Sequence, residues 1–234
     1  SDLASLQTRA VPDGDNYVID GSKIWTTGAH NADKIFCLVR TSTEGKPQEG
    51  ISFLLFDMDL PGITVKPILT YAGDHELNQV FFDDVRVPQS SRVGDENQGW
   101  TVAKYLLEFE RGGVPYTPRV KAGLLRLKDM IHKEAGDDGH SLAEDPDFRG
   151  RLAKLEIGIQ AAEIIEKRVM SALSQGENPG YASSIFKLRG SELLQEMLEL
   201  TMKTLGNYAA PYQPEAYVFG NNVEAVAPNY GLTA

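Results

Sequence analysis

Residues 17–27 read Tyr17-Val18-Ile19-Asp20-Gly21-Ser22-Lys23-Ile24-Trp25-Thr26-Thr27. An aspartate followed by a glycine between two β-rich runs is a strong local signal for a tight turn, so the stretch predicts a hairpin. In the strand expected after the turn, residues 23–27, alternation places Trp25 and Thr27 on the same face. An indole beside a hydroxyl suits a planar heterocycle that is stacked on one side and hydrogen-bonded at one edge. Taken alone, the strand is better explained by an ordinary sheet with a half-buried tryptophan.

The chain changes character near residue 93. Before it, frequent turn signals and many Val, Ile, Phe and Thr residues predict strands at 16–20, 23–27, 34–41, 51–57, 63–67 and 78–87. No helical pattern separates these strands, so they should form an antiparallel barrel or sandwich. After it, amphipathic stretches at about 97–133, 146–175 and 180–205 should pack as a helical bundle. The expected fold class is α+β, with a β domain at 1–93 and a helical domain at 94–234.

Composition excludes several functions. The 234 residues carry a formal charge of −10, which argues against binding to nucleic acid or to an anionic membrane surface. No apolar run approaches the roughly 20 residues of a membrane span. The single cysteine, Cys37, cannot form an intrachain disulfide, and its apolar surroundings in the sequence predict a core position in a reducing, intracellular protein. The four histidines share no metal-ligand spacing, so no metal is expected.

Further motifs follow residues 17–27 in a fixed order. They are Ser1-Asp2-Leu3, Gly50-Ile51-Ser52-Phe53-Leu54-Leu55, Leu60-Pro61-Gly62-Ile63, Phe82-Asp83-Asp84-Val85-Arg86-Val87-Pro88, Gly99-Trp100 and Glu110-Arg111. The ordered set resembles the middle β-domain and most of the C-terminal helical domain of acyl-CoA dehydrogenases. The resemblance implies that the N-terminal helical domain of that family and the end of its C-terminal domain are missing from this sequence.

The resemblance also implies a cofactor, FAD. Trp25 would pack against the isoalloxazine and Thr27 would hydrogen-bond its reactive edge, with Thr26 between them in the same cofactor-binding segment. Ser1 would lie where the family's loop serine approaches both flavin and substrate. Gly206 falls in a thinned version of a cofactor loop, although a helix-terminating glycine is the better explanation of that position.

The candidate catalytic base is Glu110. Trp100, Ala103, Leu106, Leu107 and Glu110 recur at helical spacings, which places the carboxylate on the apolar stripe of its helix. A carboxylate facing a core is costly unless it is paired, hydrogen-bonded or protonated, and pairing with Arg119 across the bundle is the alternative explanation. In the family the base lies either late in the chain, beyond residue 234, or immediately before an arginine on the first helix of the C-terminal domain. Glu110-Arg111 matches the second arrangement, that of the isovaleryl and long-chain types, and Arg111 would then bind or orient the substrate.

By resemblance the reaction is α,β-dehydrogenation of an acyl-CoA to a trans-2-enoyl-CoA, as in fatty acid metabolism. Electrons would pass to an electron-transfer flavoprotein, and the enzyme would be a homo- or hetero-oligomer, dimeric or tetrameric, in a bacterial-like cytoplasm or the mitochondrial matrix. Alternatives are an acyl-CoA oxidase or flavin monooxygenase of the same fold, or a non-catalytic subunit of a hetero-oligomeric dehydrogenase. One motif departs from the family: residues 138–149 replace the usual Arg and Phe-Gly that hold the FAD of a neighbouring subunit.

Overall fold

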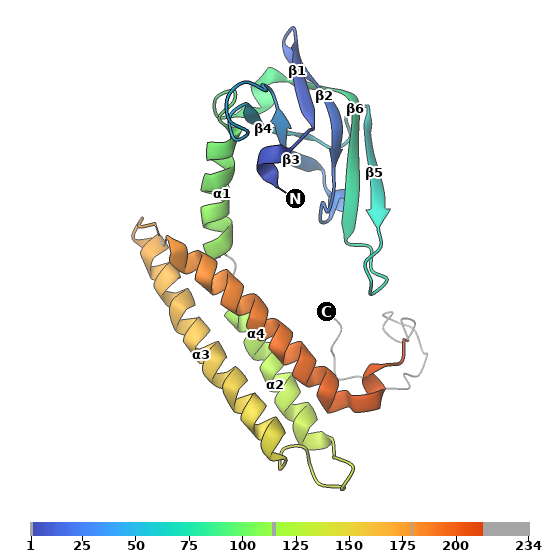
Figure 1. Ribbon diagram of the computed structural model, residues 1–234, viewed down its shortest axis with the longest axis vertical. Helices are drawn as coiled ribbons and strands as arrows, with labels where there is room; N and C mark the ends of the chain where they lie inside the picture. Colours follow the sequence, from blue (N-terminus) through green and yellow to red (C-terminus); the bar gives the residue numbers. More distant parts are fainter. Residues whose placement is uncertain (1, 114–115, 179, 213–234) are drawn as a thin grey trace. The chain divides into compact units, whose positions relative to one another are not determined.

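The computed structural model describes residues 2–113, 116–178 and 180–212. The chain divides into two compact units, residues 1–107 and 108–234. The first unit is built mainly from strands and the second from helices (Figure 1). The predicted α+β class is therefore confirmed.

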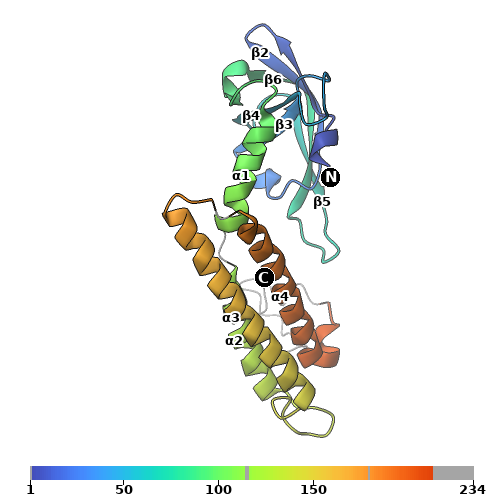
Figure 2. The ribbon, with the colours of Figure 1, turned by 60° about the vertical axis from the view of Figure 1, so that its left-hand side comes forward.

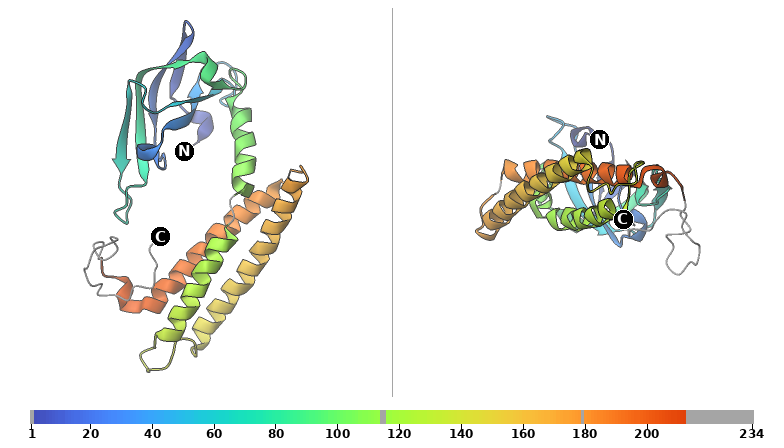
Figure 3. Two further views of the ribbon diagram at one scale, coloured as in Figure 1. Left: turned by 180° about the vertical axis from the view of Figure 1, so that it is seen from behind. Right: turned by 90° about the horizontal axis from the view of Figure 1, so that it is seen from below.

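The described part of the first unit contains one seven-stranded sheet (Figures 1 and 3). Its strands are β1 (Arg9–Asp13), β2 (Asn16–Lys23), β3 (Lys34–Arg40), β4 (Ile51–Asp57), β5 (Ile63–Ile68), β6 (Leu77–Pro88) and β7 (Arg92–Val93), in the order β5-β6-β2-β1-β3-β4-β7. Every pairing is antiparallel except that of β1 with β3, which meet in parallel at Arg9 and Arg40. Alternate residues of β2, β3 and β6 face one apolar core, as a half-buried sheet requires. Cys37 lies in this core, as predicted, and burial raises the pKa of its thiol to about 11.

The predicted turn at Asp20-Gly21 is wrong. The first hairpin instead turns at Gly14 and Asp15, because Asp13 pairs with Asn16 and joins β1 to β2. Gly14 has a φ of 59°, which suits a glycine in a tight hairpin turn. Strand β1 was not predicted because it contains Pro12, and a proline argues against a strand in the interior of a sheet.

Gly21 lies inside β2, opposite a bulge in β6: Ile19 pairs with Val85 and Gly21 with Phe82, so three steps along β6 match two along β2. The register between β2 and β6 shifts between Ile19 and Gly21, and the φ of Gly21 is 132°. A Cβ at this position would lie 2.9 Å from the Cα of Thr8, closer than real contacts allow. Glycine is required here because the neighbouring backbone approaches closely. The Asp-Gly pair is therefore explained without a chain reversal.

The helices are α1 (Gly99–Gly113), α2 (Thr117–Lys133), α3 (Pro146–Ser174) and α4 (Tyr181–Leu205). The expected single helix at 97–133 is wrong: it is divided into α1 and α2, because Gly112 and Gly113 are poor helix formers and Pro118 suits a first turn. Helices α2, α3 and α4 lie side by side as the predicted bundle (Figure 2) around an apolar core. Among the described helices, none has the length and apolar character needed to cross a membrane.

Helix α1 begins directly on the sheet. Gly99 is buried, and a Cβ there would lie 2.6 Å from the carbonyl carbon of Ser52 in β4. The Ser52 hydroxyl accepts the backbone N–H of Asn97 at 2.9 Å and contacts the Thr41 hydroxyl at 2.7 Å. These contacts fix the start of the helix that carries Glu110.

A buried carboxylate, Glu166 on α3, distinguishes the helical unit. Its side chain is only 6% exposed; one oxygen accepts the Thr117 hydroxyl, and the other has no hydrogen-bond partner among the described residues. Burial raises the pKa of Glu166, and contacts with the backbone N–H groups of Thr117 and Tyr116 offset the shift only in part. The ionised form is therefore disfavoured in the folded bundle.

We expect Glu166→Gln to stabilise the protein at pH 7. An acid whose pKa is raised on folding contributes stability below its unfolded pKa of about 4.5 and loses it as pH rises through the folded value. Glutamine keeps the shape and does not ionise, so the variant should gain of the order of 1 kcal/mol over the parent at pH 7 and less at pH 4. Thermal unfolding at both pH values measures this difference.

Glu163, one turn earlier on α3, provides a control of opposite sign. Hydrogen bonds from Lys121 and Lys167 lower the pKa of Glu163. It therefore contributes stability above its unfolded pKa and loses it as pH falls through the folded value, so Glu163→Gln should destabilise the protein at pH 7. If Glu166→Gln behaved like Glu163→Gln, Glu166 would be an ionised and paired group.

Candidate functional site

The segment after β2 forms a second bulge against β6. Lys23 pairs with Val80, and the Thr26 N–H donates to the Asn78 carbonyl at 2.9 Å. Three steps along one chain thus match two along the other, which leaves one residue in excess between Lys23 and Thr26. Pairing then continues, since the Gly28 N–H donates to the Glu76 carbonyl at 2.9 Å. The extra residue pushes the chain outward between two fixed points.

The bulge exposes an aromatic side chain on a strained backbone. Trp25 has a φ of 64°, a region that bulky residues rarely adopt, and its side chain is 56% exposed. Ile24 beside it is 46% exposed. Strain of this kind persists where the surroundings hold it in place, and it concentrates at ligand-binding sites. The tryptophan is therefore a fixed, accessible apolar surface.

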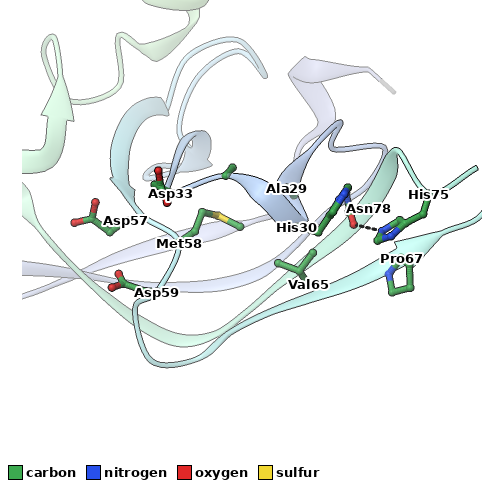
Figure 4. A pocket seen from close by; sticks show the side chains of 11 residues that line it. Ala29, His30, Asp33, Asp57, Met58, Asp59, Val65, Pro67, His75 and Asn78 are labelled. Carbon is green, nitrogen blue, oxygen red and sulfur yellow. Dashed lines mark hydrogen bonds between the residues drawn. The ribbon is translucent and has the colours of Figure 1, made fainter. Parts of the chain in front are cut away.

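The side chain of Asn78 holds the bulge from inside. Asn78 is fully buried, and its Nδ2 donates to the carbonyls of Thr26 at 3.1 Å and Glu76 at 3.3 Å. His30 Nδ1 also lies 3.1 Å from Nδ2 and shares its two N–H groups with these carbonyls. Its Oδ1 accepts from His75 Nε2 at 2.8 Å (Figure 4). The imidazoles of His30 and His75 stack with their centroids 4.1 Å apart. Backbone and side chain of Asn78 together bind both sides of Thr26.

A cavity of about 490 Å³ adjoins this network. His30, His75, Asn78, Val65 and Pro67 line one side, and Asp33, Asp57, Met58 and Asp59 line the other (Figure 4). The described residues include no group of three side chains suited to binding a metal ion.

The structure changes the expected use of residues 25–27. The strand predicted at 23–27 is wrong, because β2 ends at Lys23, so alternation does not explain the placement of Trp25 and Thr27. Both are exposed, whereas the backbone N–H and carbonyl of Thr26 are engaged by Asn78. Trp25 thus offers a stacking surface and Thr27 an accessible hydroxyl, and Thr26 secures the segment. This arrangement suits a planar heterocycle such as a flavin.

Glu110 lies in the last turn of α1 and is exposed. Its expected place against a core is wrong for this chain: Gly99 and Ala103 at the start of α1 are buried, whereas Leu106 and Glu110 are exposed. The reason is that the helix docks on β4 by its first turns only, and the division between the two units falls after Leu107.

The remaining predicted site residues are placed only in part. Arg111 also belongs to α1, but its side chain lies outside the described part, as does all of Ser1. Gly206 caps α4 with a φ of 55°, so the structural explanation as a helix-terminating glycine is confirmed.

Asn78, His30 and His75 were not predicted from the sequence to belong to the site. Asn78 shares a strand face with the core residues Val80 and Phe82. An amide at a core-facing position needs hydrogen-bond partners, which is the signal that marks it in the sequence. The two histidines gave no such signal, because they lie 45 positions apart in the sequence. They stack only because the segment Thr26–Gly28 pairs with residues 76–78.

Comparison with known proteins identifies the class. Residues 1–85 match the acyl-CoA dehydrogenase middle domain, and residues 97–222 match the acyl-CoA dehydrogenase C-terminal domain. The chain belongs to the acyl-CoA dehydrogenase family.

Particular relatives come from several bacteria. Acyl-CoA dehydrogenase FadE29 of Mycobacterium tuberculosis is 34% identical over 92% of this chain and 55% of its own length, and IpdE1 of the same organism is 35% identical over 88% and 52%. The ChsE4-ChsE5 complex from Mycobacterium tuberculosis contains a chain that is 31% identical, with a TM-score of 0.78 over 91% of this chain and 55% of that one. An acyl-CoA dehydrogenase from Geobacillus kaustophilus, 26% identical, gives a TM-score of 0.81 over 89% and 56%. The chain thus spans about half the length of the relatives it matches.

Proposed function

We propose that the protein containing this chain is an FAD-dependent acyl-CoA dehydrogenase that converts an acyl-CoA to a trans-2-enoyl-CoA. The observation that carries the proposal is the exposed, strained Trp25 on a bulge secured at Thr26, in a chain of this family. The β domain, residues 1–93, supplies the flavin-facing segment with Trp25, Thr26 and Thr27. The helical domain, residues 94–234, supplies Glu110 and Arg111, and Ser1 and Gly206 complete the proposed set.

FAD supplies the hydride acceptor for the β-hydrogen. The Glu110 carboxylate accepts the α-proton of the acyl-CoA, a step for which a positioned general base is needed because the α-carbon is a weak acid. Arg111, the next residue on α1, orients the acyl-CoA. Trp25 would hold the isoalloxazine by stacking, and Thr27 would hydrogen-bond its edge.

Relatives indicate the kind of substrate and assembly. Solved structures similar to this chain include the Tcur3481-Tcur3483 steroid ACAD and the ChsE4-ChsE5 complex. The name of each gives two proteins. We propose a bulky acyl-CoA as substrate, a hetero-oligomer as the assembly and an electron-transfer flavoprotein as the electron acceptor. A non-catalytic subunit and an oxygen-reacting oxidase or monooxygenase of the same fold are the competing functions.

Anaerobic titration of the flavin-loaded protein with acyl-CoA thioesters tests the proposal. We expect bleaching of the oxidised flavin band and formation of the enoyl-CoA in equal amounts. Admission of air should then reoxidise the ligand-bound flavin slowly, whereas rapid reoxidation would indicate an oxidase. A folded protein that binds acyl-CoA and FAD without bleaching would be a non-catalytic subunit.

A further inference from the structure

The amide of Asn78 has a defined orientation. The atom that faces the carbonyls of Thr26 and Glu76 must be the nitrogen, because two oxygens can be approached only by a donor. Its partner Oδ1 therefore faces His75 Nε2, which donates to it, and the nitrogen also lies 3.1 Å from His30 Nδ1. Asn78 is thus one part of a hydrogen-bond network that includes both histidines.

The network acts on the strained residue through its neighbour. Within the part of the chain that the structure describes, Trp25 makes no hydrogen bond that would hold its left-handed backbone. Thr26, in contrast, donates its N–H to the Asn78 carbonyl, and its own carbonyl accepts from the Asn78 side chain. Release of Thr26 would let the extra residue of the bulge relax toward ordinary backbone angles. The direction of the indole then depends on Asn78.

We propose that Asn78 is a positioning residue for the flavin: it holds Thr26, and through it the indole of Trp25, in the geometry that receives the isoalloxazine, and the stacked His30–His75 pair fixes the Asn78 amide. The inference rests on the proposed function. It extends the site to residues that would not themselves touch the cofactor. A buried amide whose hydrogen bonds are satisfied is held rigidly, which is what a stacking surface requires.

Asn78→Asp is the direct test. The aspartate matches asparagine in shape but places an acceptor oxygen opposite the carbonyls of Thr26 and Glu76 and the lone pair of His30. We expect FAD to bind about 10-fold more weakly or worse, the equivalent of one lost hydrogen bond, with a shifted flavin absorption band. In a Trp100→Phe background, which leaves Trp25 as the one tryptophan of residues 1–234, the fast local component of the fluorescence anisotropy decay should grow in the deflavinated protein relative to the same background with Asn78 intact.

Two further variants make the test specific. His75→Phe keeps an aromatic ring at an exposed position and removes the hydrogen bond to Asn78 Oδ1, so it should give a smaller change in the same direction even if Asn78→Asp does not fold. Tyr17→Phe is the control. Tyr17 also lies on β2, and the substitution removes a buried hydroxyl that is hydrogen-bonded to Glu96 and Arg92. It should alter neither FAD binding nor the anisotropy decay.

The outcomes separate the two proposals. Faster local motion of Trp25 with weaker FAD binding supports both. Faster motion with unchanged FAD binding would overturn the placement of the flavin at Trp25, and with it the proposed function of residues 25–27. The conclusion that Asn78 holds Thr26 would stand. Unchanged motion and unchanged binding in folded Asn78→Asp and His75→Phe would overturn the role of Asn78.

Discussion

Replacing Glu110 with glutamine is expected to slow flavin reduction by acyl-CoA about 10²- to 10⁴-fold, the usual contribution of a positioned general base. Glutamine matches the carboxylate in size but cannot accept the α-proton. FAD binding should be retained, because the flavin-facing residues 25–27 belong to a different segment of the chain. Stopped-flow reduction under anaerobic conditions measures the rate, and the flavin absorption spectrum measures occupancy.

Glu108→Gln is the matched control for this prediction. Glu108 lies two residues earlier on α1 and has the same side chain, and helical periodicity places positions 108 and 110 on different faces of the helix. We expect its reduction rate to stay near that of the parent. Equal rates for Glu110→Gln and the parent would show that the base lies elsewhere in the protein, as in the family members that use a late carboxylate.

Gly21→Val is expected to destabilise the first unit by about 3–5 kcal/mol, since it combines backbone strain with overpacking. The φ of 132° is unfavourable for any residue with a Cβ, and a β-branched one is worst. The new Cβ would also meet the Cα of Thr8, 2.9 Å away. Because β2 leads directly into the Trp25 bulge, FAD affinity should fall with stability. Chemical denaturation with flavin release as a second signal measures both.

Gly14→Val separates the two causes. Gly14 also has a positive φ, 59°, but nothing lies within 4 Å of a Cβ built there. This variant should show only the cost of the strained backbone, of the order of 1–3 kcal/mol. A loss in Gly21→Val no greater than that in Gly14→Val would mean that the contact with Thr8 relaxes freely.

Local pattern predicted most of the secondary structure. The strands at 34–40, 51–57, 63–68 and 77–88 and the helices at 146–174 and 181–205 follow from alternation, helical spacing and clear boundary signals, such as Asp145-Pro146 at the start of α3. Asp20-Gly21 shows where pattern fails. An Asp-Gly pair can form a turn or lie within a strand, and here the bulge in β6 opposite Gly21 and the close approach of Thr8 keep it within β2.

The sequence by itself determined the family, the α+β class and the identity of the candidate residues Trp25, Thr26, Thr27 and Glu110, because ordered motifs and periodicity are properties of the chain. Only the tertiary structure decided how residues 25–27 are presented. Trp25 is exposed because β6 pairs with residues on both sides of it and leaves one residue in excess, and because Asn78, 53 positions away, binds Thr26. Long-range pairing of this kind has no local sequence signature. Residues 17–27 therefore indicated which side chains belong to the candidate site, but not how the fold presents them.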